Sequence, residues 1–452
     1  MKIVIIGNNV AGTFTAQNIR LLNEAAEIEI FTQEKYPYYT RVRLPELISE
    51  KVIIDDLIVF NEEWYKNKQI KLNLNKTVRR INPKTKTLEL EGTDSLISYD
   101  KLVLALGSTP NIPPIKNAVK FRDEHKGLFT LRSIDDCLEI KDFIRKEKAK
   151  NAIVIGGGLL GLELANQINN SGLDTTVVEF FPRLLPRQLD MECGAMLREE
   201  IENKGIKVVL DAATEEILGN GSVTGITLKG GEVIDADIIL IQAGIRPTIN
   251  LAKDANLDTN KGIVVNAYLE TSEKDIFAVG DCIEYNNQIW GIIPACMEQS
   301  KIVAASVLGL KKVEYLGTIP KNTLKIMGLD LTSIGMIDPS KDTLEQAPGG
   351  WDILKKADKK NCCYQKLVLK DNKLKGAILF GDTKAISYVN NKMEQDVDKN
   401  ELRKLLELYI YKCQNCGKEY DEAMMEILFK DLPENFKCPN CNGPKKDFKQ
   451  KE

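Results

Sequence analysis

Short apolar runs alternate with glycine-rich turns and amphipathic stretches along most of this chain. Residues 3–6 form an unbroken β-branched run, which is typical of a parallel strand buried on both faces. A glycine turn at 7–12, a helical stretch to about residue 23 and a strand over 27–31 follow. The same order recurs later, with a strand at 152–155, a glycine turn at 156–161, a helix at 162–169 and a strand at 175–179. We therefore predict two βαβ units, each at the start of a nucleotide-binding sheet.

The pattern changes in the second half of the chain. Apolar strands predicted at 101–106 and 238–244 close the two units. After residue 309, short alternating strands are predicted at 323–326, 331–336, 364–370 and 375–380. This change indicates a separate α+β domain. Residues 396–410 are charged with spaced leucines, which predicts a connecting helix.

Length and charge narrow the class of protein. A chain of 452 residues suggests about three domains at roughly 150 residues each. Its 62 Lys+Arg and 65 Asp+Glu leave a net charge of −3, which excludes a nucleic-acid binder driven by bulk charge. No apolar run reaches the ~18 residues that span a bilayer. Since the apolar start lacks a cleavage site, we expect a cytoplasmic protein without a membrane segment.

The second glycine turn has the chemistry of a pyrophosphate site. Glycines let the backbone approach the phosphates, and the helix start offers free N–H groups. Glu179 lies at the tip of the next strand, where a carboxylate binds ribose hydroxyls and repels a 2′-phosphate. NADH is therefore favoured over NADPH, although Arg183 and Arg187 lie close in sequence. The glycines that fit the pattern are Gly156, Gly158 and Gly161.

The first glycine turn departs from that pattern. Gly7 and Gly12 hold its outer positions, but Asn9 occupies the place of the middle glycine. Glu34, near the end of the next strand, is the candidate for the ribose carboxylate. A turn of purely structural use is the alternative interpretation.

Ten cysteines are present, and four of them form two C-x-x-C pairs near the end of the chain: Cys413, Cys416, Cys438 and Cys441. Two such pairs can hold one tetrahedral metal ion. A set of four thiolates suits both zinc and iron, so spacing alone does not choose between them. The only histidine is His125, which weighs against a Ser-His-Asp hydrolase and a multi-histidine metal site.

Three further segments resemble the pyridine nucleotide–disulfide oxidoreductase family: residues 104–107, 243–247 and 276–281. The resemblance covers residues 1 to about 390. It implies that the first unit binds FAD and the second NAD(P)H, with Asp281 near the ribityl chain of the flavin and turns at Gly107 and Gly244. Arg41 would meet the pyrophosphate, Lys51 the flavin edge, and Glu163 the nicotinamide. A solvated surface residue is the alternative for Arg41, Lys51 and Glu163.

The cysteine distribution indicates a branch of that family without a redox disulfide. No cysteine precedes Cys137, so the segment beside the implied flavin, 41–51, offers no thiol. The tail resembles a rubredoxin in its aromatic residues, although Phe436 stands where tryptophan is usual and Asn442 where glycine is usual. This resemblance implies one iron in the four-cysteine site. A structural zinc ribbon is the alternative.

The predicted fold class is α/β, with two Rossmann-like domains of glutathione-reductase type, an α+β domain and a small rubredoxin-like domain with a four-cysteine metal site. The predicted boundaries are 1–110 with 238–315 for FAD, 111–237 for NAD, 316–395 for the α+β domain, 396–408 for a linker helix and 409–452 for the metal domain. The resemblance implies an NADH:rubredoxin oxidoreductase that passes electrons from NADH through FAD to its own iron centre and on to a partner protein, for example one that detoxifies oxygen or peroxide. Two alternatives stay open: an NADH oxidase or carrier reductase with a zinc docking tail, and a non-enzymatic redox sensor.

Overall fold

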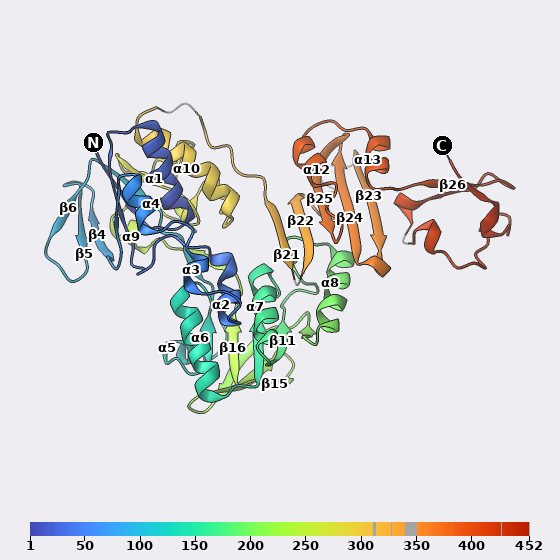
Figure 1. The fold of residues 1–452 in the computed structure, drawn as a ribbon, viewed down its shortest axis with the longest axis horizontal. Coiled ribbons are helices and arrows are strands. Elements are labelled where there is room, and N and C mark those ends of the chain that lie inside the picture. The colour runs from blue at the N-terminus through green and yellow to red at the C-terminus, as the bar shows by residue number, and fades with distance from the viewer. Residues whose placement is uncertain (311–312, 327, 340–349, 426, 452) are drawn as a thin grey trace. The chain divides into compact units, whose positions relative to one another are not determined.

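The computed structural model describes the chain except residues 311–312, 327, 340–349, 426 and 452. The described residues form two compact units. The first comprises residues 1–156, 164–175 and 214–320, and the second 157–163, 176–213 and 321–452. Figure 1 shows the order of the elements along the chain.

A five-stranded parallel sheet forms the core of the first unit. Its strands, in spatial order, are β19 (Ile276–Ala278), β7 (Lys101–Leu104), β1 (Lys2–Ile6), β2 (Glu27–Phe31) and β3 (Ile70–Asn73). The central β1 pairs with β2 and β7, so that Ile5 lies between Ile30 and Val103. All three are fully buried, as a β-branched strand covered on both faces requires. Helices α1 (Val10–Leu22) and α10 (Ile293–Val307) pack against each other in this unit.

Smaller elements of the first unit surround this sheet. An antiparallel sheet is formed by β4 (Val78–Asn82), β5 (Thr87–Leu90) and β6 (Leu96–Ser98), and a short pair by β18 (Ile263–Val264) and β20 (Ile283–Glu284). The helices are α2 (Leu44–Ile48), α3 (Ile54–Leu57), α4 (Glu62–Asn67) and α9 (Asn250–Asp254).

A second set of parallel strands in the first unit belongs to the predicted second βαβ unit. Strand β16 (Ile238–Ile241) pairs with β10 (Asn151–Ile155) on one side and β9 (Leu128–Thr130) on the other. Helices α5 (Ala118–Asp123) and α6 (Ile134–Glu147) flank β9 along the chain. An antiparallel sheet follows, made of β13 (Thr214–Gly219), β14 (Val223–Leu228) and β15 (Val233–Asp235).

Strands β7 and β16 end earlier than predicted because the chain leaves both sheets to form a two-stranded ribbon. This ribbon pairs β8 (Ser108–Pro110) with β17 (Ile245–Pro247). Gly107 and Gly244 directly precede its two strands and have φ values of 67° and 87°. Glycine adopts such left-handed angles without steric cost, so both turns can redirect the chain at this point.

The rest of the second βαβ pattern is divided between the two units, with residues 164–175 in the first and residues 157–163 and 176–213 in the second. Helix α7 (Leu159–Asn170) follows β10 along the chain, and β11 (Asp174–Val178) follows α7. Strand β11 pairs in parallel with β12 (Lys207–Val209), and α8 (Met191–Asn203) lies between them in sequence. The α/β fold class is therefore confirmed.

The α+β part of the second unit is a five-stranded antiparallel sheet (Figure 1). Its spatial order is β21 (Lys321–Ile326), β22 (Leu329–Gly335), β25 (Lys373–Phe380), β24 (Cys363–Lys370) and β23 (Trp351–Asp358). Four of these strands were predicted. Strand β23 was not, because its inward positions include the charged Lys356 and Asp358, which hide the apolar alternation.

Two short helices cover this sheet with apolar residues. They are α12 (Ile386–Lys392) and α13 (Lys399–Leu405). Leu402 and Leu406, in the segment predicted as a linker helix, are fully buried in one cluster with Leu367 and Leu379 of the sheet. This segment is therefore part of the α+β core rather than a free connection.

The tail forms its own small sheet in the order β27 (Glu419–Asp421), β26 (Ile410–Cys413) and β28 (Phe448–Gln450). Among the helices of the described chain, none is long and apolar enough to cross a bilayer.

Candidate functional site

The first glycine turn joins β1 to α1 in close contact with β7. Gly7 has φ 112°, and a Cβ there would lie 2.0 Å from the carbonyl oxygen of Ala105. A Cβ on Gly12 would lie 1.9 Å from the carbonyl oxygen of Gly7. Both glycines are therefore required by packing, whatever the turn binds. Asn9 has extended backbone angles and caps α1, since its side chain accepts a hydrogen bond from the Val10 N–H at 2.8 Å.

Glu34 and Arg41 are brought together beyond the end of β2. Glu34 accepts a hydrogen bond from Tyr39 Oη at 2.5 Å and forms an ion pair with Arg41. Both carboxylate oxygens are thus engaged by protein groups, which makes Glu34 a support for Arg41 in this structure. Burial raises the pKa of Tyr39 well above its usual range; the Arg41 cation opposes this rise and the Glu34 carboxylate adds to it, so the hydroxyl stays protonated and donates.

Asp281 lies beside a second arginine that the sequence reasoning missed. Arg132 Nη2 is 3.2 Å from Asp281 Oδ2, and Ser108 Oγ donates to the same oxygen at 2.8 Å. Arg41 also donates to the backbone carbonyl of Arg132. Burial and the neighbouring Arg41 cation both lower the pKa of Arg132. Arg132 lies between β9 and Ser133, the N-cap residue of α6, and no pattern in the sequence marks this position.

Two buried nitrogen donors in this region have no partner within the described chain. They are Asn8 Nδ2, in the first glycine turn, and Arg41 Nε. An unsatisfied buried donor costs roughly 1–3 kcal/mol, so such groups point to a ligand rich in acceptors. The neighbouring Arg41 and Arg132, together with the Asn8 amide, fit a pyrophosphate. Lys51 is exposed just after α2, and its side chain has no ion-pair partner among the residues described.

A cysteine does lie near the 41–51 segment in space, although none lies there in sequence. The Cys137 thiol, on α6, is fully buried and donates to the Leu44 carbonyl at 3.4 Å. Burial, followed by the Asp136 charge, raises its pKa to about 12. A thiol with such a pKa is a poor nucleophile at neutral pH.

In the second glycine turn, Glu179 is 6% exposed and held by backbone donors. Its carboxylate accepts from the Gly157 N–H at 2.5 Å and the Phe181 N–H at 2.9 Å. A Cβ on Gly157 would lie 3.0 Å from a Glu179 oxygen, whereas a Cβ on Gly158 would meet nothing within 4 Å. Because Gly157 has no Cβ, the Glu179 carboxylate can lie close to the turn. The glycine motif does not include this residue.

The other residues predicted around this turn lie on α7 or directly after β10. Gly161 is buried and Glu163 half-buried, both on α7. Gly156 has φ 119°, and a Cβ there would lie 2.4 Å from the Gln242 carbonyl oxygen. Position 156 thus requires glycine for its left-handed φ and for its close contact with the Gln242 carbonyl.

Arg183 is engaged by backbone carbonyls rather than available to a phosphate. Its guanidinium donates to the carbonyl of Leu189 at 2.9 Å and to that of Pro186 at 3.1 Å. These contacts weaken the argument from the sequence that Arg183 could bind the 2′-phosphate of NADPH. Arg187 is exposed.

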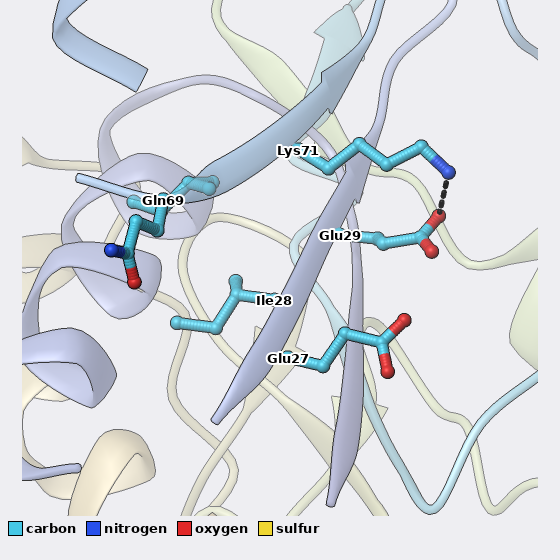
Figure 2. A pocket seen from close by; sticks show the side chains of 6 residues that line it. Glu27, Ile28, Glu29, Gln69 and Lys71 are labelled. Carbon is cyan, nitrogen blue, oxygen red and sulfur yellow. Dashed lines mark hydrogen bonds and ion pairs between the residues drawn. The ribbon is translucent and has the colours of Figure 1, made fainter. Parts of the chain in front are cut away.

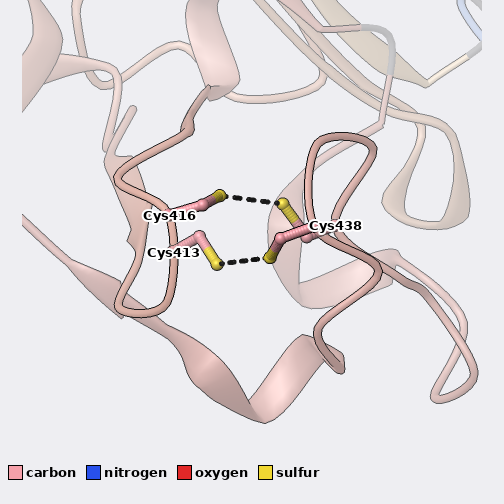
Figure 3. Close-up of side chains that lie close together, drawn as sticks. Cys413, Cys416 and Cys438 are labelled. Carbon is pink, nitrogen blue, oxygen red and sulfur yellow. Dashed lines mark hydrogen bonds between the residues drawn. The ribbon is translucent and has the colours of Figure 1, made fainter.

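The four tail cysteines meet at the tips of two similar hairpins (Figure 3). In the first hairpin, the Gly417 N–H donates to the Cys413 carbonyl, and Gly417 has φ 76°. In the second, the Asn442 N–H donates to the Cys438 carbonyl, and Asn442 has φ 56°. Asparagine tolerates left-handed angles better than most residues, which explains how Asn442 replaces the usual glycine.

The sulfur atoms are spaced as one metal ion requires. Cys413 Sγ is 3.7 Å from Cys441 Sγ, and Cys416 Sγ is 3.6 Å from Cys438 Sγ. All four ligand atoms lie within 4.8 Å of one another. A tetrahedral ion with metal–sulfur bonds of ~2.3 Å would separate its sulfurs by about 3.8 Å. The donor set therefore fits a tetrahedral thiolate-bound metal.

The cysteines differ in their exposure and protonation. Cys413 and Cys438 are buried, Cys416 is half-buried and Cys441 is exposed. Hydrogen bonds from the Asn440 side chain and the Lys418 N–H lower the pKa of Cys416 to about 6. The exposed side of the cluster is therefore formed by Cys416 and Cys441.

An aromatic shell surrounds the buried side of the cysteines. The residues predicted from the resemblance, among them Tyr420, Phe436 and Phe448, pack in one cluster with Cys413 and Cys438. Phe429, which was not singled out, lies at its centre. Its ring stacks on Tyr411 with centroids 4.0 Å apart and lies 5.4–6.4 Å from the rings of Tyr420, Phe436 and Phe448.

Ion pairs join the tail to the α+β sheet and α13. Arg403 donates to both Asp421 oxygens, at 2.7 and 2.6 Å. Lys430 pairs with the buried Asp358 at 3.0 Å. Ala423 and Leu428 of the tail belong to the same apolar cluster as the α+β core. The metal domain is thus docked on its neighbour in the second unit.

A surface pocket in the first unit contains none of the predicted site residues. It is lined by Glu27, Ile28, Glu29, Gln69, Ile70 and Lys71 (Figure 2). These residues lie toward the amino ends of β2 and β3, whereas nucleotides bind at the carboxyl ends of parallel strands. Burial opposes ionisation of Glu29, but hydrogen bonds from Lys2 and Lys71 outweigh it and lower the pKa. The pocket therefore reflects a structural ion-pair cluster.

Several named proteins are similar to this chain. A relative from Bacillus subtilis named nitrite reductase [NAD(P)H] is 32% identical over 446 residues, which cover 98% of this chain and 52% of the relative. An NADH-rubredoxin oxidoreductase from Clostridium acetobutylicum is 32% identical over 381 residues, 84% of this chain and 91% of the relative. A Methanocaldococcus jannaschii protein named NADH oxidase is 33% identical over 348 residues, 74% of this chain and 76% of the relative. The chain spans about half the length of several curated relatives, including the Bacillus protein.

One solved structure and two protein families also match this chain. The structure of the NADH:rubredoxin oxidoreductase from Clostridium acetobutylicum matches with a TM-score of 0.66 and 27% identity, over 86% of this chain and 93% of that one. Residues 320–397 match the family described as "Rubredoxin NAD+ reductase C-terminal domain". Residues 1–300 match the family described as "Pyridine nucleotide-disulphide oxidoreductase". The chain belongs to the pyridine nucleotide-disulphide oxidoreductase family.

Proposed function

We propose that the chain is an NADH-dependent flavoprotein reductase that delivers electrons to an iron centre in its own tail and from there to a redox partner. FAD would bind residues 1–110 with 238–315, and NADH residues 111–237. The α+β domain would be 316–395, the following helix 396–408 and the metal domain 409–452. The four-cysteine cluster carries the proposal, because it is docked on a segment matching the rubredoxin reductase C-terminal domain.

The residues of the first unit fit FAD. Arg41 and Arg132 would neutralise its pyrophosphate, Glu34 would orient Arg41, and Asp281 would accept a hydrogen bond from the ribityl chain. Bound flavin supplies the chemistry that accepts two electrons together and releases them singly. Lys51 would lie at the flavin edge and Glu163 near the nicotinamide.

Zinc is the second candidate for the tail. Four thiolates at these distances suit zinc as well as iron. In that case the tail would be a structural docking module, and oxygen or a separate carrier would accept the electrons. The relative named NADH oxidase agrees with such an acceptor.

Metal analysis and stopped-flow absorption test the proposal. Protein purified without added metal should contain about one iron per chain and show an iron–thiolate band. When NADH is mixed in, this band should bleach after flavin reduction and no slower than turnover. A colourless, zinc-filled tail, or bleaching slower than turnover, would contradict the internal relay and favour the docking module.

Nucleotide preference tests the role of Glu179. Backbone N–H groups hold its carboxylate at the glycine turn, and carboxylate oxygens can accept further hydrogen bonds. Glu179 should therefore accept the ribose hydroxyls of NADH and repel the 2′-phosphate of NADPH. Glu179→Ala should weaken NADH binding by roughly 1.5–3 kcal/mol, about 10- to 150-fold in Kd. Titration of the oxidised enzyme with each nucleotide measures this loss.

Glu179→Gln is the matched variant, since it keeps the size and removes the charge. Its affinity for NADPH relative to NADH should rise above that of the wild type. Equal kcat/KM for the two nucleotides in the wild type would refute the assignment of Glu179.

A further inference from the structure

Four acidic side chains in the described part of the tail hold it on its neighbour or stabilise its own fold. Asp421 binds Arg403, and Asp431 pairs with Lys360 at 3.0 Å. Glu419 pairs with Lys451 at 2.9 Å. Glu422 is buried and accepts from the Tyr409 and Phe429 N–H groups. These four carboxylates therefore contribute little negative charge to the free surface of the tail.

By contrast, four lysines around the cysteine hairpins form no ion pair with the described residues of the tail. Lys412 and Lys418 flank the first hairpin, and Lys437 directly precedes the second. On β28, Lys449 lies opposite Lys412 in the sheet. All four are exposed and, within the described part of the tail, have no ion-pair partner.

Among the described residues of the tail, the other carboxylates do not cancel this positive charge. Exposed lysines without a partner in the described tail are Lys412, Lys418, Lys437, Lys446 and Lys449. Against these five stand two carboxylates without a cationic partner, the exposed Glu434 and Asp447, which accepts from the Asn415 amide at 2.6 Å. Four thiolates around a ferric ion would add a single negative charge.

We propose that this lysine-framed side of the tail, where Cys416 and Cys441 are accessible, docks an acidic one-electron acceptor protein. The proposal rests on the proposed function. With iron held by the four cysteines, the ferrous centre would give up one electron and become ferric, and the oxidised acceptor would be reduced by that electron. Attraction between the lysines and acidic groups would bring the acceptor close to the exposed thiolates. The rate should therefore depend on ionic strength.

One acceptor in two charge forms tests this surface. Native cytochrome c is basic, and the same protein after succinylation of its lysines is acidic. At low ionic strength, the oxidised whole enzyme should bind the succinylated form more tightly than the native form. The triple variant Lys412→Gln, Lys418→Gln and Lys437→Gln should raise the Kd for the succinylated form by about tenfold. This difference should disappear in about 0.5 M salt.

A second triple variant is the control, with exposed lysines of the first unit that form no ion pair with any described residue: Lys66→Gln, Lys229→Gln and Lys253→Gln. It should bind as the wild type does. An equal loss in this control, tighter binding of native cytochrome c by the wild type, or binding that is insensitive to salt would each overturn the proposal.

Binding is measured without NADH, so this result does not depend on the relay. The relay is tested separately by the rate at which NADH reduces succinylated cytochrome c in Cys438→Ser. An unchanged rate there would refute the proposed function, while the effect of the lysines on Kd would still decide the docking surface. The iron–thiolate band and flavin content of the lysine variants should match the wild type, which shows that both sites are intact.

Discussion

Cys438→Ser should abolish electron delivery from the tail while NADH still reduces the flavin. Cys438 is fully buried, and its sulfur lies 3.6 Å from that of Cys416. Loss of this ligand leaves three thiolates and a hydroxyl, which should hold iron poorly. Replacing a residue that hydrogen-bonds to a metal ligand typically lowers metal affinity or activity by about 10- to 100-fold. Loss of a ligand itself should therefore lower electron delivery by at least about 100-fold. The proposed flavin residues lie in the other unit, which has its own core.

Three measurements separate the outcomes of Cys438→Ser. Iron per chain and delivery to a one-electron protein acceptor should fall together, whereas flavin content and reduction of a small dye should persist. Cys363→Ser is the control, because this half-buried thiol lies outside the metal cluster. If delivery survives in Cys438→Ser, electrons leave the flavin directly.

The glycine turns and the cysteine hairpins were predictable because their chemistry is local in sequence. Gly7 and Gly12 fall at the spacing that a strand-to-helix turn demands, and each now shows a close backbone contact that excludes a side chain. The C-x-x-C pairs likewise carry their geometry within a few residues. Such motifs need no knowledge of the rest of the fold.

Residues that act across the chain were missed or placed differently. Arg132 reaches Asp281 from a position 149 residues away, so no local pattern links them. Glu34, which is predicted to bind a ribose hydroxyl, also binds Tyr39 and Arg41 through its two oxygens, and these contacts were not anticipated. Strand β23 was missed because two of its inward residues are charged and find partners elsewhere: Lys356 binds Glu407, and Asp358 binds Lys430.

Asp190→Asn should strongly destabilise the second unit. Asp190 caps α8 by accepting from the Cys193 N–H at 3.0 Å, and it is 5% exposed. It also accepts from Tyr364 Oη at 2.5 Å and from Lys366 Nζ at 2.9 Å. Removing one charge of a buried pair typically costs about 3–5 kcal/mol, because the other charge stays buried. Asp338 also contacts Lys366, at 3.2 Å, and is half-exposed, so we expect the lower end of that range.

Hydrogen exchange of the β24 amides measures this loss as a faster local opening. The matched double variant, Asp190→Asn with Lys366→Met, removes the stranded cation and should recover part of the loss. If the double variant is as unstable as the sum of its single changes, the buried pair is not the cause.

The pH dependence of stability supplies a second test of the same group. Burial raises the pKa of Asp190, but hydrogen bonds from Tyr364, Lys366 and the Cys193 N–H outweigh it and lower the pKa below its usual value. The unfolded chain therefore binds a proton on Asp190 at higher pH than the folded chain does. The stability that this carboxylate provides should be complete above about pH 4 and should decline as pH falls toward the lower, folded pKa. In Asp190→Asn, this part of the acid-induced loss should be absent. An unchanged pH profile in that variant would show that Asp190 does not carry the charge that stabilises the second unit.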